Sequence, residues 1–200
     1  NLGFFSDVKV RNLVGSSEEQ TITELMVEEQ STGELSVGIG YSSLEQTSVA
    51  FGIDERNFLG TGRGLSLSFE FSQKRSNLRI GVSEPYLFGR NLTGRASVFN
   101  EKIKQDSVSI SKTGIDLGIG FDAAQDYYHG VGYELSQSKT TESSSTATSI
   151  TGENGAQILT SAASYVVGQD RLDNRFDPSE GTLLELRQEL AGIGGDAKFY

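Results

Sequence analysis

Apolar residues alternate with small or polar residues along much of this sequence, and this period of two constrains the fold more than any other feature. In residues 33–43, one face of an extended chain would carry Leu35, Val37, Ile39 and Tyr41. Residues 65–72, 78–83 and 115–122 repeat the pattern. A tilted strand that crosses a bilayer needs about ten residues, which is close to the length of these segments. The alternation predicts strands with one apolar face and one small or polar face.

A soluble β-sandwich also alternates, with its apolar face toward a core. Three features favour a transmembrane barrel instead. The polar faces contain charges and glycines in strand interiors, which suits a wet or tightly curved barrel interior. Compact connections alternate with longer polar ones, as expected for short turns on one side of a membrane and longer loops on the other. Aromatic residues lie near the segment ends, as in an interfacial girdle: Phe58, Tyr86, Phe88, Tyr127, Tyr128 and Phe176.

Turn-like stretches divide the chain into strands. We predict compact turns at 57–62, 87–91, 124–129 and 173–181, and a long loop rich in Ser and Thr at 139–155. The runs between them predict about nine strands: 33–43, 47–57, 63–73, 77–87, 91–104, 108–123, 129–140, 156–170 and 182–192.

The sequence before residue 33 has a different texture. Residues 7–14 and 21–29 predict two short strands joined by a polar turn at 15–19, and residues 1–5 resemble a helix end. This arrangement predicts the tail of a small α/β domain, with its boundary at 30–33. The chain begins at Asn1 without Met, and Tyr200 falls in a strand-like run, so we expect a fragment of a longer protein.

Charge and composition exclude several function classes. The formal net charge of −10 argues against nucleic acid as a partner, because phosphate binding needs a basic surface. The absence of Cys excludes disulfides and thiolate metal sites. His129 is the single histidine and lies in a turn, where a Ser/His/Asp site is not expected. We therefore predict no enzymatic activity and no cofactor.

Three further motifs have plain structural interpretations. The glycine-rich run 60–64 is flanked by strands on both sides, so it predicts a hairpin turn rather than a phosphate loop. The carboxylates at Asp170, Asp173, Asp177 and Glu180 could bind calcium, but their spacing favours a polar turn. Residues 91–93 form an Asn-Leu-Thr sequon inside a predicted strand, which carries little meaning.

Four charged residues fall on the predicted inward faces: Arg79, Arg95, Glu70 and Asp116. Pairing between neighbouring strands in a solvated lumen is favoured over ion selectivity.

Several longer stretches resemble the BamA family. Residues 1–8 and 27–43 are similar to the end of the last POTRA domain running into the barrel. Similar motifs follow in the family's order: 55–60 (Glu-Arg-Asn-Phe-Leu-Gly), 84–90 (Glu-Pro-Tyr-Leu-Phe-Gly-Arg), 170–178 (Asp-Arg-Leu-Asp-Asn-Arg-Phe-Asp-Pro) and 191–196 (Ala-Gly-Ile-Gly-Gly-Asp). They look most like the versions found in alphaproteobacteria.

The resemblance implies an all-β fold, the N-terminal half of a transmembrane antiparallel β-barrel, with about nine of roughly sixteen strands present. Residues 1–30 would be the C-terminal part of the last POTRA domain, in the periplasm, and residues 31–200 the truncated barrel, in the bacterial outer membrane. The implied function is assembly and insertion of outer-membrane β-barrel proteins. The implied partners are nascent β-barrel proteins, accessory lipoproteins of the assembly complex and outer-membrane lipids.

Two alternatives stay open. A Val-Arg-Gly-Phe-type motif that marks the family does not occur in this chain, so a TamA-type translocation pore or a two-partner secretion pore fits as well.

The family's first barrel strand forms a weak seam, and by resemblance that strand is 33–43. We therefore predict a substrate-pairing edge that uses neither metal nor nucleotide, made of Gly33, Glu34, Leu35, Ser36, Val37, Gly38, Ile39, Gly40 and Tyr41. Gly38 and Gly40 would weaken this strand, or they would fit the curvature of the barrel.

Overall fold

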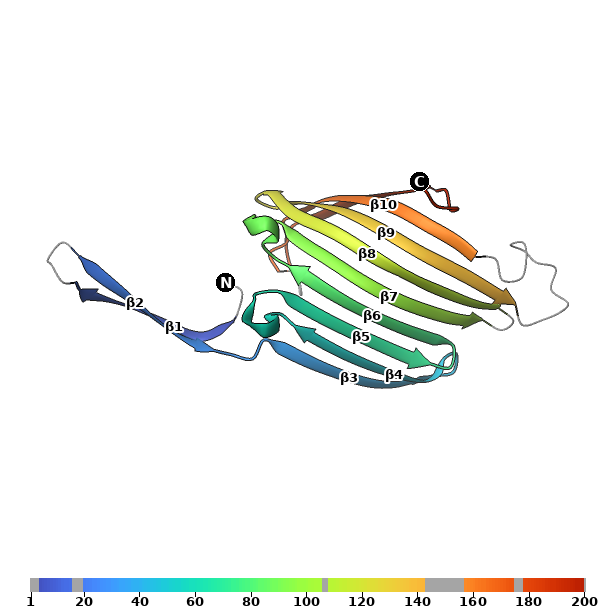
Figure 1. Cartoon of the computed structure of the whole chain (residues 1–200), viewed down its shortest axis with the longest axis horizontal. Helices are drawn as coiled ribbons and strands as arrows, with labels where there is room; N and C mark the ends of the chain where they lie inside the picture. The colour runs from blue at the N-terminus through green and yellow to red at the C-terminus, as the bar shows by residue number, and fades with distance from the viewer. Residues whose placement is uncertain (1–3, 16–19, 106–107, 143–156, 175–177, 200) are drawn as a thin grey trace.

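The computed structural model describes residues 4–15, 20–105, 108–142, 157–174 and 178–199. They form a two-stranded and a nine-stranded antiparallel sheet. The first contains β1 (Phe5–Val14) and β2 (Thr21–Glu29). The second contains β3 (Gly33–Ser42), β4 (Gln46–Glu55), β5 (Gly64–Ser72), β6 (Arg75–Glu84), β7 (Thr93–Gln105), β8 (Val108–Ala124), β9 (Tyr127–Glu142), β10 (Gln157–Asp170) and β11 (Leu183–Ala191). Figure 1 shows the small sheet extending away from the end of the large sheet at which β3 begins.

All nine predicted strands of the large sheet are present, with ends within three residues of the predicted ones. Each strand pairs with its neighbours in the chain, so the order from one edge to the other is β11 to β3. The register keeps like residues together. One row of residues paired across β6 to β9 is entirely apolar (Ile80, Val98, Ile115 and Leu135). The adjacent row is mixed, with a charged, an aromatic and two small residues (Arg79, Phe99, Gly114 and Ser136). The sheet therefore has an apolar face and a polar face, as the period of two predicts.

This sheet is a single layer without an ordinary core. Among the described residues, Phe99 and Ala162 are the only buried hydrophobic ones. Many large side chains of the apolar face are exposed, whereas Leu65, Leu67 and Leu135 are half-buried. None of the helices in the described part of the chain is long and apolar enough to cross a membrane.

The connections at the end where β3 begins include two short 3-10 turns, η1 (Phe58–Gly60) and η2 (Leu87–Gly89). The turns share one backbone conformation, because Leu59 and Phe88 both have left-handed φ angles, of 54° and 56°. The glycines that follow, Gly60 and Gly89, also have positive φ. The predicted hairpin at 60–64 and the compact turns at 57–62 and 87–91 are thus confirmed, and β8 and β9 are joined by two residues in the same region.

The predicted alternation of compact and long connections is wrong for the opposite end of the sheet. There, β3 and β4 are separated by three residues, and β5 and β6 by two. Serine side chains make such short turns possible. The hydroxyl oxygen of Ser42 accepts a hydrogen bond from the Glu45 amide at 2.9 Å, and that of Ser72 accepts one from the Arg75 amide at 2.9 Å. In the loop predicted at 139–155, residues 139–142 belong to β9, and the remainder lies outside the described residues.

The N-terminal strands are confirmed, but the predicted helix end is not, because Phe5 already begins β1. Residues 1–3, and 16–19 of the predicted turn, lie outside the described residues.

Among the predicted girdle aromatics, Phe58, Tyr86, Phe88 and Tyr127 are exposed. Tyr128 departs from this set. Its ring covers Gly168, and its hydroxyl donates to Glu185 at 2.7 Å. Phe176 is outside the described residues.

Candidate strand-pairing edge

The predicted pairing edge, residues 33–41, lies entirely in β3, which is one of the two edge strands of the large sheet, with β11 at the other edge. In the described part of the chain, β3 pairs with β4 alone, from Gly33 opposite Glu55 to Ser42 opposite Gln46. One side of its backbone therefore has no neighbouring strand among the described residues. Unpaired N–H and C=O groups of this kind are a template for another strand.

The apolar side chains of β3 are less covered than those of the next strand. Ile39 is 79% exposed and Tyr41 is 80% exposed, whereas Ile53 in β4 is 38% exposed. The difference follows from position, because β4 has a neighbour on both sides and β3 on one. An incoming strand would therefore gain both backbone hydrogen bonds and apolar contacts along β3.

Beyond Glu34, which lies opposite Asp54, the interior of the polar face of β3 carries small residues that face small residues of β4. Ser36 lies opposite Gly52, Gly38 opposite Ala50, and Gly40 opposite Ser48. The Ser36 hydroxyl donates to the Gly52 carbonyl at 3.5 Å, which is a long hydrogen bond. Contacts between large side chains thus do not strengthen the β3–β4 pair on this face.

The two glycines in the interior of β3, Gly38 and Gly40, are not required by a left-handed backbone, since neither has a positive φ. A Cβ atom added at Gly38 would meet the Ala50 Cβ at 3.7 Å, which is an ordinary contact. At Gly40 it would meet the Ser48 hydroxyl at 2.9 Å, and a serine side chain can rotate. The backbone of β3 would accept alanine at 38, which favours a weakened strand over a steric need for glycine.

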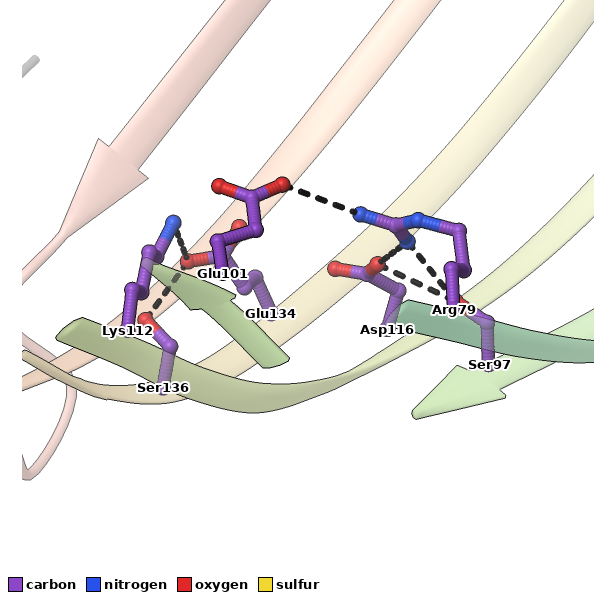
Figure 2. A network of polar contacts seen from close by, with 7 residues as sticks. All are labelled: Arg79, Ser97, Glu101, Lys112, Asp116, Glu134 and Ser136. Atoms are coloured by element: carbon purple, nitrogen blue, oxygen red, sulfur yellow. Dashed lines mark hydrogen bonds and ion pairs between the residues drawn. The ribbon is translucent and has the colours of Figure 1, made fainter. Parts of the chain in front are cut away.

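The middle of the sheet contrasts with this edge. Figure 2 shows seven polar residues of β6 to β9, called here the central network: Arg79, Ser97, Glu101, Lys112, Asp116, Glu134 and Ser136. Arg79 forms an ion pair and a hydrogen bond with Asp116, and the Ser97 hydroxyl donates to Asp116 at 3.1 Å. Lys112 pairs with Glu134 at 2.8 Å. Arg79 and Asp116 thus pair on the polar face, but the predicted pairing between neighbouring strands is wrong for them, because they lie on β6 and β8 and their contact spans β7. In the described part of the chain, no ion pair involves Arg95 or Glu70.

Phe99 lies beneath the central network on the polar face, and it is 4% exposed. The Arg79 guanidinium carbon is 4.7 Å from the centre of the Phe99 ring, and the Lys112 ammonium is 5.4 Å from it. Gly114 makes room for the ring, because a Cβ there would meet Phe99 at 2.8 Å. Phe99 is not among the residues predicted from the sequence, although the sequence contains one signal for it. Val98 and Phe99 are adjacent apolar residues, which breaks the alternation.

The remaining candidates have structural roles. The His129 ring stacks on Phe121 with a centroid distance of 5.2 Å, and its Nδ1 is 2.6 Å from the Tyr165 hydroxyl. The described residues contain no group of His, Asp and Glu side chains that could hold a metal ion. Asp177 of the proposed calcium set lies outside the described residues.

Asp173 closes the connection between β10 and β11. Its carboxylate accepts hydrogen bonds from the hydroxyl and amide of Ser179, at 2.6 and 3.0 Å, and from the Glu180 amide at 3.1 Å. These bonds, led by the one from the Ser179 hydroxyl, lower the pKa of Asp173 to about 2. The polar-turn interpretation accounts for these bonds.

Comparison with known proteins agrees with this geometry. Residues 57–200 match the Omp85 superfamily domain. The chain belongs to the Omp85 superfamily. As an Omp85 chain it is 32% identical, over 203 aligned positions, to the outer membrane protein assembly factor BamA of Neorickettsia risticii (strain Illinois). It is 27% identical over 198 positions to the protein of the same name in Nitratidesulfovibrio vulgaris. These alignments cover 100% and 98% of the chain but 27% and 25% of the relatives, so the chain spans about a quarter of their length.

The fold is also that of a solved structure. The crystal structure of BamA from Haemophilus ducreyi lacking POTRA domains 1-3 matches with a TM-score of 0.80 and 19% identity, over 98% of this chain and 41% of that one. The predicted fold class, part of an antiparallel β-barrel, is confirmed by this likeness and by the nine-stranded sheet.

Proposed function

We propose that this chain is part of a factor that assembles β-barrel proteins and inserts them into the bacterial outer membrane, with β3 as the lateral edge on which a substrate strand pairs. The observation that carries the proposal is the position of residues 33–41 in β3, one of the two edge strands of the large sheet. The name of the two relatives, outer membrane protein assembly factor, supports it.

The physics of a bilayer favours this use of an edge strand. An unpaired backbone N–H or C=O group in hydrocarbon costs several kcal/mol by order of magnitude, since no water is present to bond it. A nascent strand that pairs with β3 would remove this cost for both partners. Strand addition by β-augmentation needs no metal, nucleotide or covalent step. The uncovered apolar face of the sheet, with Ile39 and Tyr41 at its edge, suits a lipid environment.

The domain assignment is part of the same proposal. Residues 1–30 form the end of a POTRA domain in the periplasm, and residues 31–200 form part of the barrel in the outer membrane. The separate β1–β2 sheet and the absence of strand in residues 30–32 support this division. The partners are nascent outer-membrane β-barrel proteins, accessory lipoproteins and outer-membrane lipids.

Disulfide crosslinking in the complete protein tests the pairing edge. Single cysteines are placed at Leu35, Val37 and Ile39, and a barrel substrate stalled during assembly carries cysteines along its terminal strand. We expect crosslinks that follow one register, since strand pairing fixes the opposing residue. Cysteines at Ile115 and Leu117, in a strand with two neighbours, are the matched controls and should give none.

Two results would count against the proposal. Crosslinks from β3 that reach only the protein's own last strand during active assembly would rule out pairing with the substrate. A substrate that passes through the barrel without becoming membrane-embedded would instead indicate a TamA-type or two-partner secretion pore.

A further inference from the structure

Residues 30–33 connect the small sheet to β3 and are called here the joint. Hydrogen bonds fix this segment at both of its ends. The Gln30 amide donates to the Phe4 carbonyl at 3.1 Å, which extends the β1–β2 pairing. The Thr32 carbonyl accepts from the Arg56 amide at 3.3 Å, and the Thr32 hydroxyl donates to the Glu55 carboxylate. One residue, Ser31, separates the two held positions. The chain therefore passes from one sheet to the other through a short and hydrogen-bonded segment.

Glu55 is the centre of this joint. Its Oε1 accepts from the Thr32 hydroxyl and also from the Asn57 amide, at 2.7 Å. The carboxylate lies over Gly33, where an added Cβ would meet Oε2 at 2.7 Å. Gly33 and Glu55 are also the first register pair of β3 and β4. One side chain thus contacts the residue before the edge strand, its first residue and the start of the following turn.

The next turn provides a natural comparison. Glu84 occupies the equivalent place before η2, and its carboxylate accepts from the Tyr86 amide at 3.3 Å. Its other partner is the side chain of Arg63, with Nε at 2.6 Å, and Arg63 lies in the preceding connection. Each glutamate therefore accepts a hydrogen bond from a backbone amide of the turn that follows it. Glu55 differs because its second partner, Thr32, belongs to the joint.

We propose that Glu55 is a positioning residue that holds the base of β3 and the joint together, so that movement of the N-terminal sheet reaches the pairing edge through the Thr32–Glu55 hydrogen bond. This inference rests on the proposed function for its purpose, but the contact can be tested in the absence of substrate. β3 has a single paired neighbour among the described strands, and Glu34, the first residue of its polar face, lies opposite a second carboxylate, Asp54, so few other side-chain contacts fix its base. A hydrogen bond to a carboxylate is a strong one by the standards of side-chain contacts.

Hydrogen exchange of the complete protein in lipid nanodiscs, without substrate, is the first measurement. Thr32→Val removes the hydroxyl with little change in shape, and Glu55→Ala removes the carboxylate. Both should raise amide exchange of residues 33–36 by about tenfold, as expected for one lost charge-assisted hydrogen bond. Residues 39–42, at the far end of β3, should not change. Thr32→Ser restores the donor and should restore protection, whereas Glu84→Ala should leave β3 unaffected.

The second measurement is the distance distribution between spin labels at Glu24 in β2 and Lys102 in β7, both exposed side chains. It should broaden in Thr32→Val and Glu55→Ala, and keep its wild-type width in Thr32→Ser and Glu84→Ala. Wild-type exchange and width in both Thr32→Val and Glu55→Ala would overturn the proposal, and so would equal effects of Glu84→Ala. Because no substrate is present, a failed crosslinking test of the pairing edge would leave these results intact, and the reverse also holds.

Discussion

The β3–β4 pair and the β6–β9 region follow the same alternation but differ on the polar face. In β3 and β4, Gly38 lies opposite Ala50 and Gly40 opposite Ser48. In the β6–β9 region, the ion pairs of the central network join residues on different strands above a buried Phe99. One period of two therefore builds both a weakly held edge and a strongly held middle. The identity of the polar-face residues decides which of them forms.

This difference suits the proposed function. A strand that exchanges partners must lose few contacts when it moves, whereas the rest of the sheet must keep its curvature meanwhile. Small residues on the polar face of β3 make its side-chain contacts with β4 on that face slight. Side-chain contacts across neighbouring strands are the main stabilising unit of a sheet beyond its backbone bonds. We therefore expect substitutions in the middle to change stability and substitutions at the edge to change assembly.

Phe99→Ala should have the largest effect on stability. It empties a site that is 4% exposed and removes the ring beneath Arg79 and Lys112. We expect a loss of about 3 kcal/mol in the free energy of unfolding, measured by urea titration in lipid vesicles. Phe71→Ala, at a 53% exposed site on the apolar face, is the control and should cost clearly less. Equal losses would show that the middle is no more tightly held than the lipid-facing surface.

Removing one partner of the central ion pair should have a smaller effect. Asp116→Ala leaves Arg79 with Glu101, whose carboxylate is 3.9 Å away. Because both side chains of the pair are about a third exposed, we expect a loss of about 1 kcal/mol rather than the value of a buried pair. The same unfolding titration, repeated at high salt, should show a smaller difference from wild type. A loss that does not depend on salt would assign the effect to packing.

Adding a methyl group to the edge should stabilise it slightly and slow its exchange of partners. The site of Gly38→Ala has room, and strand glycine costs roughly 0.5–1 kcal/mol relative to alanine. We expect slower substrate insertion into liposomes with unchanged or slightly raised stability. Gly52→Ala is the matched control, since its Cβ would meet the Ser36 hydroxyl at 2.5 Å. If Gly38→Ala inserts substrate at the wild-type rate, the glycines have no role in exchange.

The sequence predicts the strands well because each is long enough to cross a bilayer and alternates along its length. Their order follows from antiparallel pairing of chain neighbours, and so the edge position of residues 33–42 could be anticipated. The hydrogen bonds that Ser42 and Ser72 accept in the short turns after β3 and β5 could not be anticipated, because they depend on how each side chain is placed against the backbone. The ion pair of Arg79 with Asp116, 37 residues apart, depends on register. The contact of Thr32 with Glu55 depends on where β3 begins.

Protonation of Asp173 should have the smallest effect of the changes considered. Asp173 lies outside both the β3–β4 pair and the β6–β9 region, so it is an independent test of the comparison between them. Its pKa is lowered to about 2 from a usual value near 3.8 by the Ser179 hydroxyl and neighbouring amides. A depressed folded-state pKa means that the carboxylate contributes stability above about pH 3.8 and loses it as the pH falls through about 2. NMR signals of the 171–174 segment should therefore titrate near pH 2, and Asp173→Asn should abolish that titration. Signals from β3 and from the central network should not share this midpoint, because neither contacts Asp173. A midpoint near 3.8 would instead mean that Ser179 does not hold the carboxylate, and the connection between β10 and β11 would then be as weakly fixed as the pairing edge.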